Sequence, residues 1–342
     1  MVMELTVTLD NEARIDTIIR DLDVGRKSRP EDHVREMTGY WKHHLSKIHI
    51  EKVDSSRVTV SGESGFYFPG MTYSGLDLLN TLYKRFGLLR WIRGTRFDIS
   101  IPQNRHQKFG YKIGGKFISS DFLRSIHHAD NIITRAEKAG DMLPESPKVL
   151  EIGPGTGIQA LVFNLLFKKS VYYLVDFPET LALASVFLSA VVPNKKILFF
   201  DEWQSNPELL TSNEYDFVLV PNYAIAQIPS DVVHVAINTV SMQEMNYSTI
   251  GMYFTQLRRI LKSPALFYQC NRDKKMDGIL IELAQYPYMD SDMHIYKEKD
   301  AFCKNSIFMR KCFGRFPLLC HIQIPIIKSG TQCSYLTVMA KK

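Results

Sequence analysis

The sequence lacks the features that define several broad classes of protein. Its 342 residues include only five cysteines, which lie in the last quarter of the chain with no C-x-x-C pair. An odd number of scattered cysteines argues against a disulfide framework, so we expect reduced thiols and a cytoplasmic protein. The longest apolar stretch, Leu181 to Val192, is shorter than the roughly 18 residues of a membrane span. The N-terminus also lacks the basic start and apolar core of a secretory signal.

What the chain does contain is the composition of a globular protein, with one local excess of positive charge. Hydrophobic residues make up 45% of the chain and charged residues 23%, and the formal net charge is +6. Between Lys84 and Lys116, nine lysines and arginines accompany a single acid, Asp98, with aromatic residues interleaved. This segment suits a solvated face in which arginine stems cover apolar surface, or a site for an anionic small molecule or glycan. Nucleic acid is the least favoured partner.

The most informative segment is a glycine-rich turn between an apolar strand and an amphipathic helix. It reads VLEIGPGTGIQALVFNLL, from Val149 to Leu166. Gly153, Gly155 and Gly157 allow the backbone to turn sharply and to approach a ligand that a side chain would keep away. The helix that follows directs unpaired N–H groups and the positive end of its dipole toward that ligand. This arrangement suits a cofactor that contains adenosine.

A second strand ends in an acid suited to binding a ribose. Residues 171–175 are rich in β-branched and aromatic side chains, and Asp176 follows them. A carboxylate beside the glycine turn can accept hydrogen bonds from two ribose hydroxyls. Dinucleotide-binding dehydrogenases use the same device, but their G-x-G-x-x-G pattern needs glycine or alanine where this chain has Ile158. The simpler alternative is a tight β–α turn in an unrelated α/β protein, with Asp176 capping the next helix.

The chain divides near Pro144. Residues 1–143 are mainly helical in pattern and are expected to form a substrate or lid region. Helices are predicted there at residues 31–48, 75–92 and 119–140.

Residues 144–342 alternate strands with helices, which predicts an α/β fold with a doubly wound, mostly parallel sheet. Strands are predicted at residues 148–152, 171–176, 196–200, 217–221, 232–238 and 265–270, and a helix at 246–262. Two final extended runs, at residues 316–328 and 333–341, predict a C-terminal antiparallel hairpin.

The run E-x-G-x-G-x-G, Asp176 and the terminal hairpin together resemble the class I S-adenosylmethionine-dependent methyltransferases. The resemblance implies their fold and S-adenosylmethionine as the cofactor. Phe177 is then expected against the adenine face, and Asn222 against its edge, with Asp201 as the alternative to Asn222. The candidate cofactor-binding residues are Glu151, Gly153, Gly155, Thr156, Gly157, Asp176, Phe177, Asn222, Asn238 and Thr239.

A closer resemblance covers roughly residues 105–342. The segment SMQEM at Ser241–Met245, together with CNRDKK, YPYMDSD and GYKIGGKFISSDFLR, resembles a family of sugar O-methyltransferases. The resemblance implies methyl transfer to a hydroxyl of a sugar or glycan intermediate, a small-molecule partner. One departure is Pro154, where many relatives carry a second glycine, because proline removes one N–H that could face the cofactor.

The candidate catalytic residues lie beyond the predicted strand at residues 232–238 and on the helix before the glycine turn. Glu244 is the first candidate for the base that takes the hydroxyl proton, with an acid favouring the next helix N-terminus as the alternative. Gln243 is a candidate hydrogen-bond partner of the acceptor, and His127 a second candidate catalytic group. No metal is expected, because His127 and His128 are neighbours on a helix and their side chains point in different directions.

Two other functions remain open at the level of sequence. One is a nicotinamide-dependent oxidoreductase, against which Ile158 and the final hairpin both count. The other is a non-catalytic protein that keeps the methyltransferase fold and binds an anionic ligand through the basic segment. The oligomeric state is not predicted.

Overall fold

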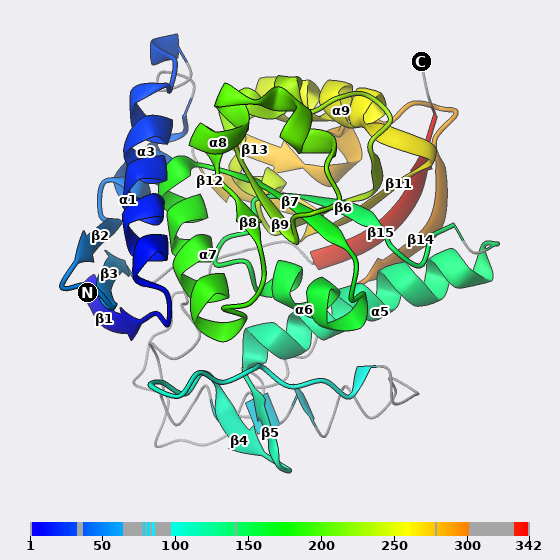
Figure 1. Ribbon diagram of the computed structural model, residues 1–342. Helices are drawn as coiled ribbons and strands as arrows, with labels where there is room; N and C mark the ends of the chain where they lie inside the picture. Colours follow the sequence, from blue (N-terminus) through cyan, green and yellow to red (C-terminus); the bar gives the residue numbers. More distant parts are fainter. Residues whose placement is uncertain are drawn as a thin grey trace, which may run out of the picture.

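An eight-stranded sheet lies at the centre of the protein (Figure 1). The computed structural model describes residues 2–32, 37–63, 78, 81–82, 84–85, 97–140, 142–277, 279–300 and 332–340. The sheet has the strand order β14-β15-β11-β10-β6-β7-β9-β8. Its strands are β6 (Lys148–Ile152), β7 (Val171–Asp176), β8 (Ile197–Leu198), β9 (Phe217–Pro221), β10 (Val233–Thr239), β11 (Leu261–Arg272), β14 (Met293–Lys299) and β15 (Gln332–Met339).

The predicted parallel sheet with an antiparallel C-terminal part is confirmed. The six strands from β6 to β11 pair in parallel, whereas β15 is antiparallel to both of its neighbours, β11 and β14. The carboxyl ends of the parallel strands therefore meet at one edge of the sheet, where ligands of α/β proteins bind.

Two details of the strand predictions are wrong. The strand expected at residues 196–200 is limited to β8, because Phe200 begins helix α8 (Phe200–Ser205). The partner of β15 also differs from the predicted hairpin strand, because β11 pairs with one edge of β15 and β14 with the other. The segment 316–328, which was expected to pair with it, lies outside the described residues.

Helices cover both faces of the sheet (Figure 1). The apolar cluster on one face takes residues from α5 (Ser120–Lys138), α6 (Ile158–Leu166) and α7 (Pro178–Val191). The cluster on the other face takes residues from α8 and α9 (Tyr247–Ile260). The strands contribute alternately to the two clusters: Val149, Tyr172 and Leu174 to the first, Leu150, Tyr173 and Val175 to the second. Within the described segments, no helix has the length and apolar character needed to cross a bilayer.

The N-terminal region combines helices with a small antiparallel sheet of order β1-β3-β2. Its elements are β1 (Val2–Thr8), α1 (Glu12–Lys27), α3 (Gly39–Leu45), β2 (His49–Lys52) and β3 (Arg57–Glu63). The single helix predicted at residues 31–48 is wrong, because Thr38 is extended and its hydroxyl caps α3, which ends before β2. Helix α1 packs against α7, and residues of both belong to the first apolar cluster.

A tight hairpin leads into the long helix α5. Strands β4 (Tyr111–Ile113) and β5 (Lys116–Ile118) are joined by Gly114 and Gly115, both with positive φ. The Ser119 hydroxyl then accepts a hydrogen bond from the Phe122 amide, which caps α5 as its serine-rich start predicts. The predicted helix at 75–92 lies mostly outside the described residues, as does much of the basic segment.

The remaining elements connect the strands of the large sheet. A second hairpin, β12 (Lys274–Asp277) with β13 (Ile279–Glu282), follows β11. Four short 3-10 turns complete the described part: η4 (Pro207–Thr211), η5 (Asn222–Gln227), η6 (Met242–Glu244) and η7 (Leu283–Gln285).

Candidate active site

The glycine turn has the left-handed backbone that its sequence predicts. Gly153, Gly155 and Gly157 have φ angles of +73°, +57° and +79°. A Cβ atom at Gly153 would lie 2.2 Å from the Ser241 Oγ, so no side chain fits there. At Gly157 a Cβ would lie 3.3 Å from Leu188 of α7, where the turn packs close to the helix. Packing therefore requires glycine at position 153, whereas at Gly157 the left-handed backbone and the close contact with α7 both favour it.

Gly155 differs from Gly153 and Gly157 because, apart from its chain neighbours, no atom of the described residues lies within 4 Å of where its Cβ would be. Its amide nitrogen lies 3.3 Å from Oδ2 of Asp176, to which it donates a hydrogen bond. The turn therefore exposes bare backbone beside the acid that ends β7. Helix α6 begins directly after the turn, so its N-terminus also faces this space. Thr156 is buried within the same loop.

Asp176 is a buried carboxylate whose oxygens each accept one backbone hydrogen bond. Oδ1 accepts from the Phe177 amide at 2.8 Å, and Oδ2 accepts from Gly155. Burial raises the pKa of Asp176 to about 7, although the two backbone hydrogen bonds lower it. Each carboxylate oxygen can accept a further hydrogen bond, so the group can still receive two hydroxyls.

Glu151 lies at the end of β6 but is turned into the core. Its Oε2 accepts a hydrogen bond from the Tyr172 hydroxyl at 2.8 Å, and its side chain is almost completely buried. Burial raises the pKa of Glu151 to about 8, while the Tyr172 hydrogen bond opposes the shift. These contacts favour a role for Glu151 in ordering the glycine turn over a direct contact with a ligand.

The side chains expected near the adenine come from three different elements. Phe177 follows β7, and its ring lies 5.4 Å from that of Trp41 in α3. Asn222 follows β9 and is buried, and its Oδ1 accepts a hydrogen bond from the Tyr223 amide at 3.1 Å. Strand β9 pairs with β7, and Pro221 lies opposite Asp176, so Asn222 follows directly beside that acid.

Asp201, the alternative to Asn222, is directed elsewhere. It lies in α8 after the edge strand β8, and its carboxylate pairs with Arg20 of α1 at 2.7 Å. Its amide donates to Asp21 of the same helix. Asp201 therefore joins α8 to the N-terminal region and does not lie beside Asp176.

A buried amide network closes the carboxyl end of β10. The Asn238 side chain donates to Ile152 O and Ser241 Oγ and accepts from the amides of Met242 and Asn271. Both donors and the acceptor of the Asn238 side chain are therefore used by protein partners. Asn238 can affect a ligand only by holding residues 240–243 in position. Thr239, the next residue, is half-buried.

The same network includes Gln243, one of the candidate catalytic residues. Its backbone amide donates to the Asn271 side chain, and its side-chain oxygen accepts from the Arg272 amide at 2.9 Å. Two of the segments on which the sugar O-methyltransferase resemblance rests, SMQEM and CNRDKK, thus contact each other. Sequence reasoning named the first segment but did not single out Ser241 or Asn271.

Val240 lies between these network residues in a strained conformation. Its φ is +63°, a region that β-branched residues rarely adopt. Its amide donates to Cys270 O at 2.8 Å, which helps to hold the turn. Backbone strain of this kind persists only where the surrounding structure enforces it, and it is often found at ligand-binding sites.

Glu244 is placed at the carboxyl edge of the sheet, at the end of η6. Its carboxylate forms an ion pair with Lys275 of β12 at 3.0 Å, and both side chains are mostly buried. The cap of the next helix is Asn246, which lies two residues after Glu244 and whose side chain accepts from the Thr249 amide. Glu244 is therefore held by the β12–β13 hairpin and does not cap α9.

His127 and His128 of α5 reach the antiparallel end of the sheet. The His127 Nε2 lies 3.2 Å from the buried carboxylate of Asp300, and His128 Nδ1 lies 2.8 Å from the Tyr268 hydroxyl. Burial lowers the pKa of His128 to about 3. Burial alone would raise the pKa of Asp300, but the His127 hydrogen bond and the charge of the two histidines bring it below its usual range.

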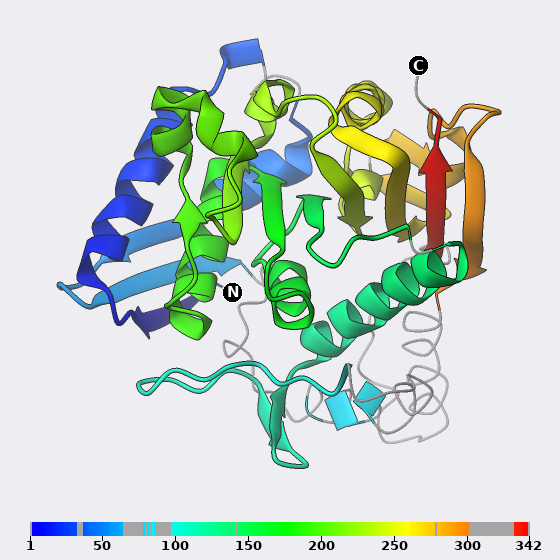
Figure 2. The ribbon, with the colours of Figure 1, turned by 45° about the vertical axis from the view of Figure 1, so that its right-hand side comes forward.

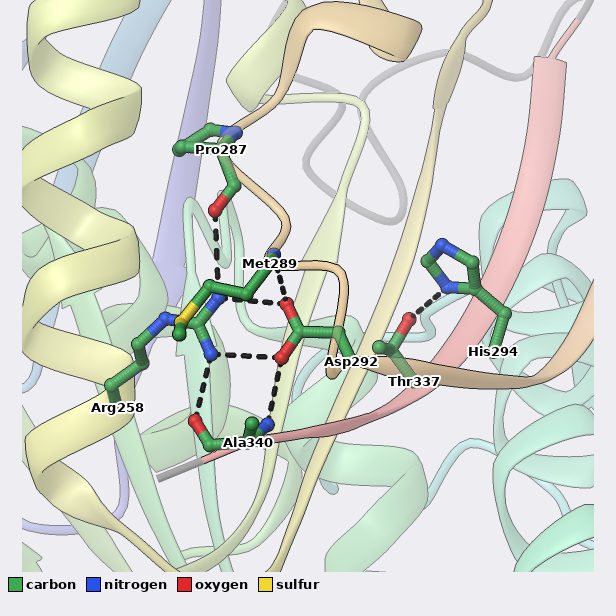
Figure 3. A network of polar contacts seen from close by, with 7 residues as sticks. All are labelled: Arg258, Pro287, Met289, Asp292, His294, Thr337 and Ala340. Carbon is green, nitrogen blue, oxygen red and sulfur yellow. Dashed lines mark hydrogen bonds and ion pairs between the residues drawn. The ribbon is translucent and has the colours of Figure 1, made fainter. Parts of the chain in front are cut away.

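The acids of the YPYMDSD segment have separate environments. Asp292 forms a buried ion pair with Arg258 of α9, and its carboxylate also accepts from the amides of Met289 and Ala340 (Figure 3). Asp290 is exposed. The segment thus anchors α9 to the end of β15 and contributes no group to the glycine turn.

Comparison with known proteins gives structural likeness only. No protein-family model matches the chain, and no curated protein resembles its sequence. The YcgJ protein of Bacillus subtilis is 13% identical over 63% of this chain and 99% of its own, with a TM-score of 0.37. Phosphoethanolamine N-methyltransferase 2 of Haemonchus contortus, solved with S-adenosylhomocysteine, is 10% identical over 84% and 64%, with a TM-score of 0.40.

A third solved structure is that of CrArsM, an arsenic(III) S-adenosylmethionine methyltransferase from Chlamydomonas reinhardtii. It is 12% identical over 57% of this chain and 64% of its own, with a TM-score of 0.33. This chain therefore spans slightly less than two thirds of the Haemonchus and Chlamydomonas enzymes.

The strand order itself defines the class of fold. Within the described sheet, β9-β7-β6-β10-β11-β15-β14 is the order of the class I methyltransferase fold, with β15 antiparallel. Strand β8 adds an extra edge beyond β9. The fold of this chain is that of the class I methyltransferases.

Proposed function

We propose that the protein is an S-adenosylmethionine-dependent O-methyltransferase that acts on a hydroxyl of a sugar or glycan intermediate. The observation that carries the proposal is the open backbone at Gly155 beside the Asp176 carboxylate. S-adenosylmethionine, when bound, supplies an electrophilic methyl group on a sulfonium. The residues of the chain bind that cofactor, orient the acceptor and take its proton.

The turn and the adjacent strands offer a group for each part of the cofactor. The N-terminus of α6, next to the open backbone at Gly155, suits a carboxylate, because the N–H groups of a first helical turn and the helix dipole favour an anion. The N–H of Gly155 itself donates to Asp176. Asp176 suits the ribose, because a carboxylate accepts from two hydroxyls. Phe177 and Asn222 supply the aromatic face and the polar edge for an adenine. The backbone at Pro154 has no N–H to offer, so binding depends on the later residues of the turn.

Glu244 is the group that we propose as the base. Methyl transfer to an alcohol is an in-line displacement, which requires the oxygen about 3 Å from the methyl carbon and a group to take its proton. The carboxylate of Glu244 lies at the carboxyl edge of the sheet, where Lys275 fixes its position. Gln243, which hydrogen-bonds Arg272 and Asn271, is proposed to help to position the acceptor beside Glu244.

The acceptor class rests on the sequence resemblance and on the contact between its two segments. SMQEM follows β10 and CNRDKK ends β11, and the Gln243–Asn271 contacts bring them together. A hydroxyl acceptor is consistent with a site built from amides and one carboxylate, since such groups hydrogen-bond sugars. The proposal therefore names a sugar or glycan acceptor and leaves the hydroxyl position open.

The test is methyl transfer from labelled S-adenosylmethionine to a panel of glycosides, with binding of S-adenosylhomocysteine measured by calorimetry. We expect cofactor binding and turnover on at least one glycoside. The variant Glu244→Gln should keep S-adenosylhomocysteine binding and lower kcat about 10²- to 10⁴-fold, the usual contribution of a general base. The matched control is Glu282→Gln, which removes the ion pair with Lys274 in the same hairpin and should leave kcat unchanged.

Each alternative function gives a different result in the same experiments. An oxidoreductase would bind a nicotinamide dinucleotide in preference to S-adenosylhomocysteine. A non-catalytic binding protein would bind S-adenosylhomocysteine without turnover on any acceptor. Unchanged kcat in Glu244→Gln, with turnover present, would remove Glu244 from the mechanism and leave the cofactor assignment in place.

A further inference from the structure

The groups around His127, His128 and Asp300 form a compact cluster beyond the proposed cofactor site. One ligand atom from each of the three side chains lies within 4.8 Å of the others. His128 and Asp300 are buried, and the His127 side chain is 16% exposed. Helix α5 carries both histidines and runs close to β14 and β15 in both views of the chain (Figures 1 and 2).

We propose that His127, His128 and Asp300 bind a divalent first-row transition metal ion, such as Zn²⁺, Mn²⁺ or Co²⁺. Two imidazoles and one carboxylate are a donor set that these ions prefer over Mg²⁺ or Ca²⁺. Three protein ligands leave at least one coordination position open, as in catalytic metal sites.

The distance between the first two donors already suits a shared ion. His127 Nε2 and Asp300 Oδ2 are 3.2 Å apart. Two ligands that each lie about 2.1 Å from one ion, at angles between octahedral and tetrahedral, are separated by roughly 3.0–3.4 Å. The third donor, from His128, has a ring nitrogen within 4.8 Å of the other two ligand atoms.

A chain of hydrogen bonds fixes the tautomer of His128. Ser334 donates to Asp300 at 2.8 Å, and the Tyr268 hydroxyl donates to Ser334 at 3.2 Å. Tyr268 has then used its proton, so His128 Nδ1 must donate to the Tyr268 oxygen. The lone pair of His128 is therefore on Nε2, which is buried and has no hydrogen-bond partner among the described residues.

This buried, unpartnered nitrogen is the observation that points to a ligand. A buried acceptor without a partner loses free energy, so each case requires an explanation. Metal-binding histidines usually donate their other N–H to a fixed acceptor, which orients the ring. Tyr268 provides that acceptor for His128, and Ser334 orients the carboxylate of Asp300. Asn131, which also contacts His127, completes the polar surroundings.

The cluster lies on the same edge of the sheet as the glycine turn. Cys270 pairs with both Thr239 and Ser334, so the start of β15 is level with the end of β10. Three strand spacings of about 4.8 Å separate β6 from β15, which places the cluster roughly 14 Å across the sheet from the turn. It is therefore close to the acceptor side but separate from the residues proposed to bind the cofactor. An ion bound there would use the lone pair of His127, so this residue would hold the ion and not accept a proton.

The test is ion binding by untagged full-length protein that has been stripped with a chelator. Titration with Co²⁺, followed by visible absorption, reports the ligand field, and titration with Zn²⁺ by calorimetry reports stoichiometry. We expect one ion per chain, and at least a 100-fold weaker affinity in His127→Ala and in Asp300→Asn. Ser334→Ala, which removes only the orienting hydrogen bond, should weaken binding about 10- to 100-fold.

The control uses the other adjacent histidine pair of the chain. His43 lies beside His44 on α3, far along the sequence from Asp300, and His43→Ala should bind the ion as the wild type does. Thermal unfolding with and without Zn²⁺ separates a fold defect from a lost site, because only an intact site raises the melting temperature. No binding by the wild type, or unaltered binding by His127→Ala and Asp300→Asn, would overturn the proposal. Neither result depends on methyl transfer, so the proposed function is tested separately.

Discussion

At the scale of single residues, the glycine turn divides into positions required by the protein and one position, Gly155, that faces the proposed cofactor site. Gly153 is required because Ser241 occupies the space of its missing side chain. Gly155 has a similar backbone conformation but no protein neighbour in that direction. Glycine is thus needed at position 153 because a side chain would overlap Ser241, whereas at position 155 it leaves the backbone open to a bound molecule.

Replacing each glycine by alanine separates these two roles. Gly153→Ala should unfold the turn or the protein, since its Cβ would overlap Ser241, whereas Gly155→Ala should cost only about 1–2 kcal/mol for its left-handed backbone. Gly155→Ala should nevertheless lose most of its affinity for S-adenosylhomocysteine. Thermal unfolding and calorimetry measure the two effects. The double variant Gly153→Ala/Ser241→Gly should recover part of the lost stability, and no recovery would contradict the steric explanation.

The carboxylate of Asp176 should make the proposed ribose binding depend on pH. Its pKa is raised to about 7, and hydroxyl donors favour the ionised form, so affinity should be constant above that pH and weaken below it. The slope should approach tenfold per pH unit. 5′-Methylthioadenosine is the suitable probe because it carries the ribose without the titratable amino-acid tail. Calorimetry of the wild type and Asp176→Asn checks this, and an equal pH dependence in both would contradict it.

At the scale of elements, a buried ion pair anchors α9 to the antiparallel part of the sheet. Arg258 of α9 donates to both oxygens of Asp292, to Pro287 O and to Ala340 O at the end of β15 (Figure 3). Although burial alone would raise the pKa of Asp292, the Arg258 side chain brings it below the ordinary value. The carboxylate therefore stays charged, and the position of α9 depends on it.

Removing one partner of this pair should be costly. Asp292→Asn leaves Arg258 buried without its counter-charge, so we expect a loss of about 3–5 kcal/mol in the free energy of unfolding. Asp290→Asn, two residues away and exposed, should change it by less than about 0.5 kcal/mol. Denaturant unfolding measures both variants. Equal stability of the two would show that the ion pair contributes nothing to the anchoring of α9.

At the scale of the whole molecule, the N-terminal region and the large sheet share one apolar cluster. Residues of β1 and α1 pack in the same cluster as those of α7 and β7. Ion pairs of Arg26 and Arg29 with Glu179 add to the contact between α1 and the start of α7. Because Phe177 precedes Glu179 and packs on Trp41, the N-terminal region also lies against the proposed adenine site.

A ligand at that site should therefore stabilise the whole protein. S-adenosylhomocysteine at 100 times its Kd should add about 2.7 kcal/mol to the free energy of unfolding, and the melting temperature should rise with the logarithm of its concentration. Asp176→Ala should show little of this rise at the same concentrations. Scanning fluorimetry of both proteins provides the measurement, and an absent shift in the wild type would argue against cofactor binding.

The predictions from sequence were confirmed where a local pattern of apolar and turn residues is enough to set the bounds of an element. Strands β6, β7 and β9 have the predicted bounds, because short apolar runs between turn signals mark buried parallel strands. The helix predicted at residues 31–48 failed, since the Thr38 cap and β2 interrupt an otherwise helical pattern. The partner of β15 was not predictable either, because strand pairing depends on distant segments and not on adjacent ones.

The amino-acid sequence by itself determined the glycine turn, the acid after the second strand and the alternation of strands with helices, because each depends on backbone sterics and hydrophobic periodicity within a few residues. Only the tertiary structure decided which side chains meet. It turned Glu151 toward Tyr172, paired Glu244 with Lys275, and brought Asp300 to His127 across 173 positions of the chain. Such contacts follow from the order of strands in the sheet, which the packing of both faces fixes and no local pattern encodes.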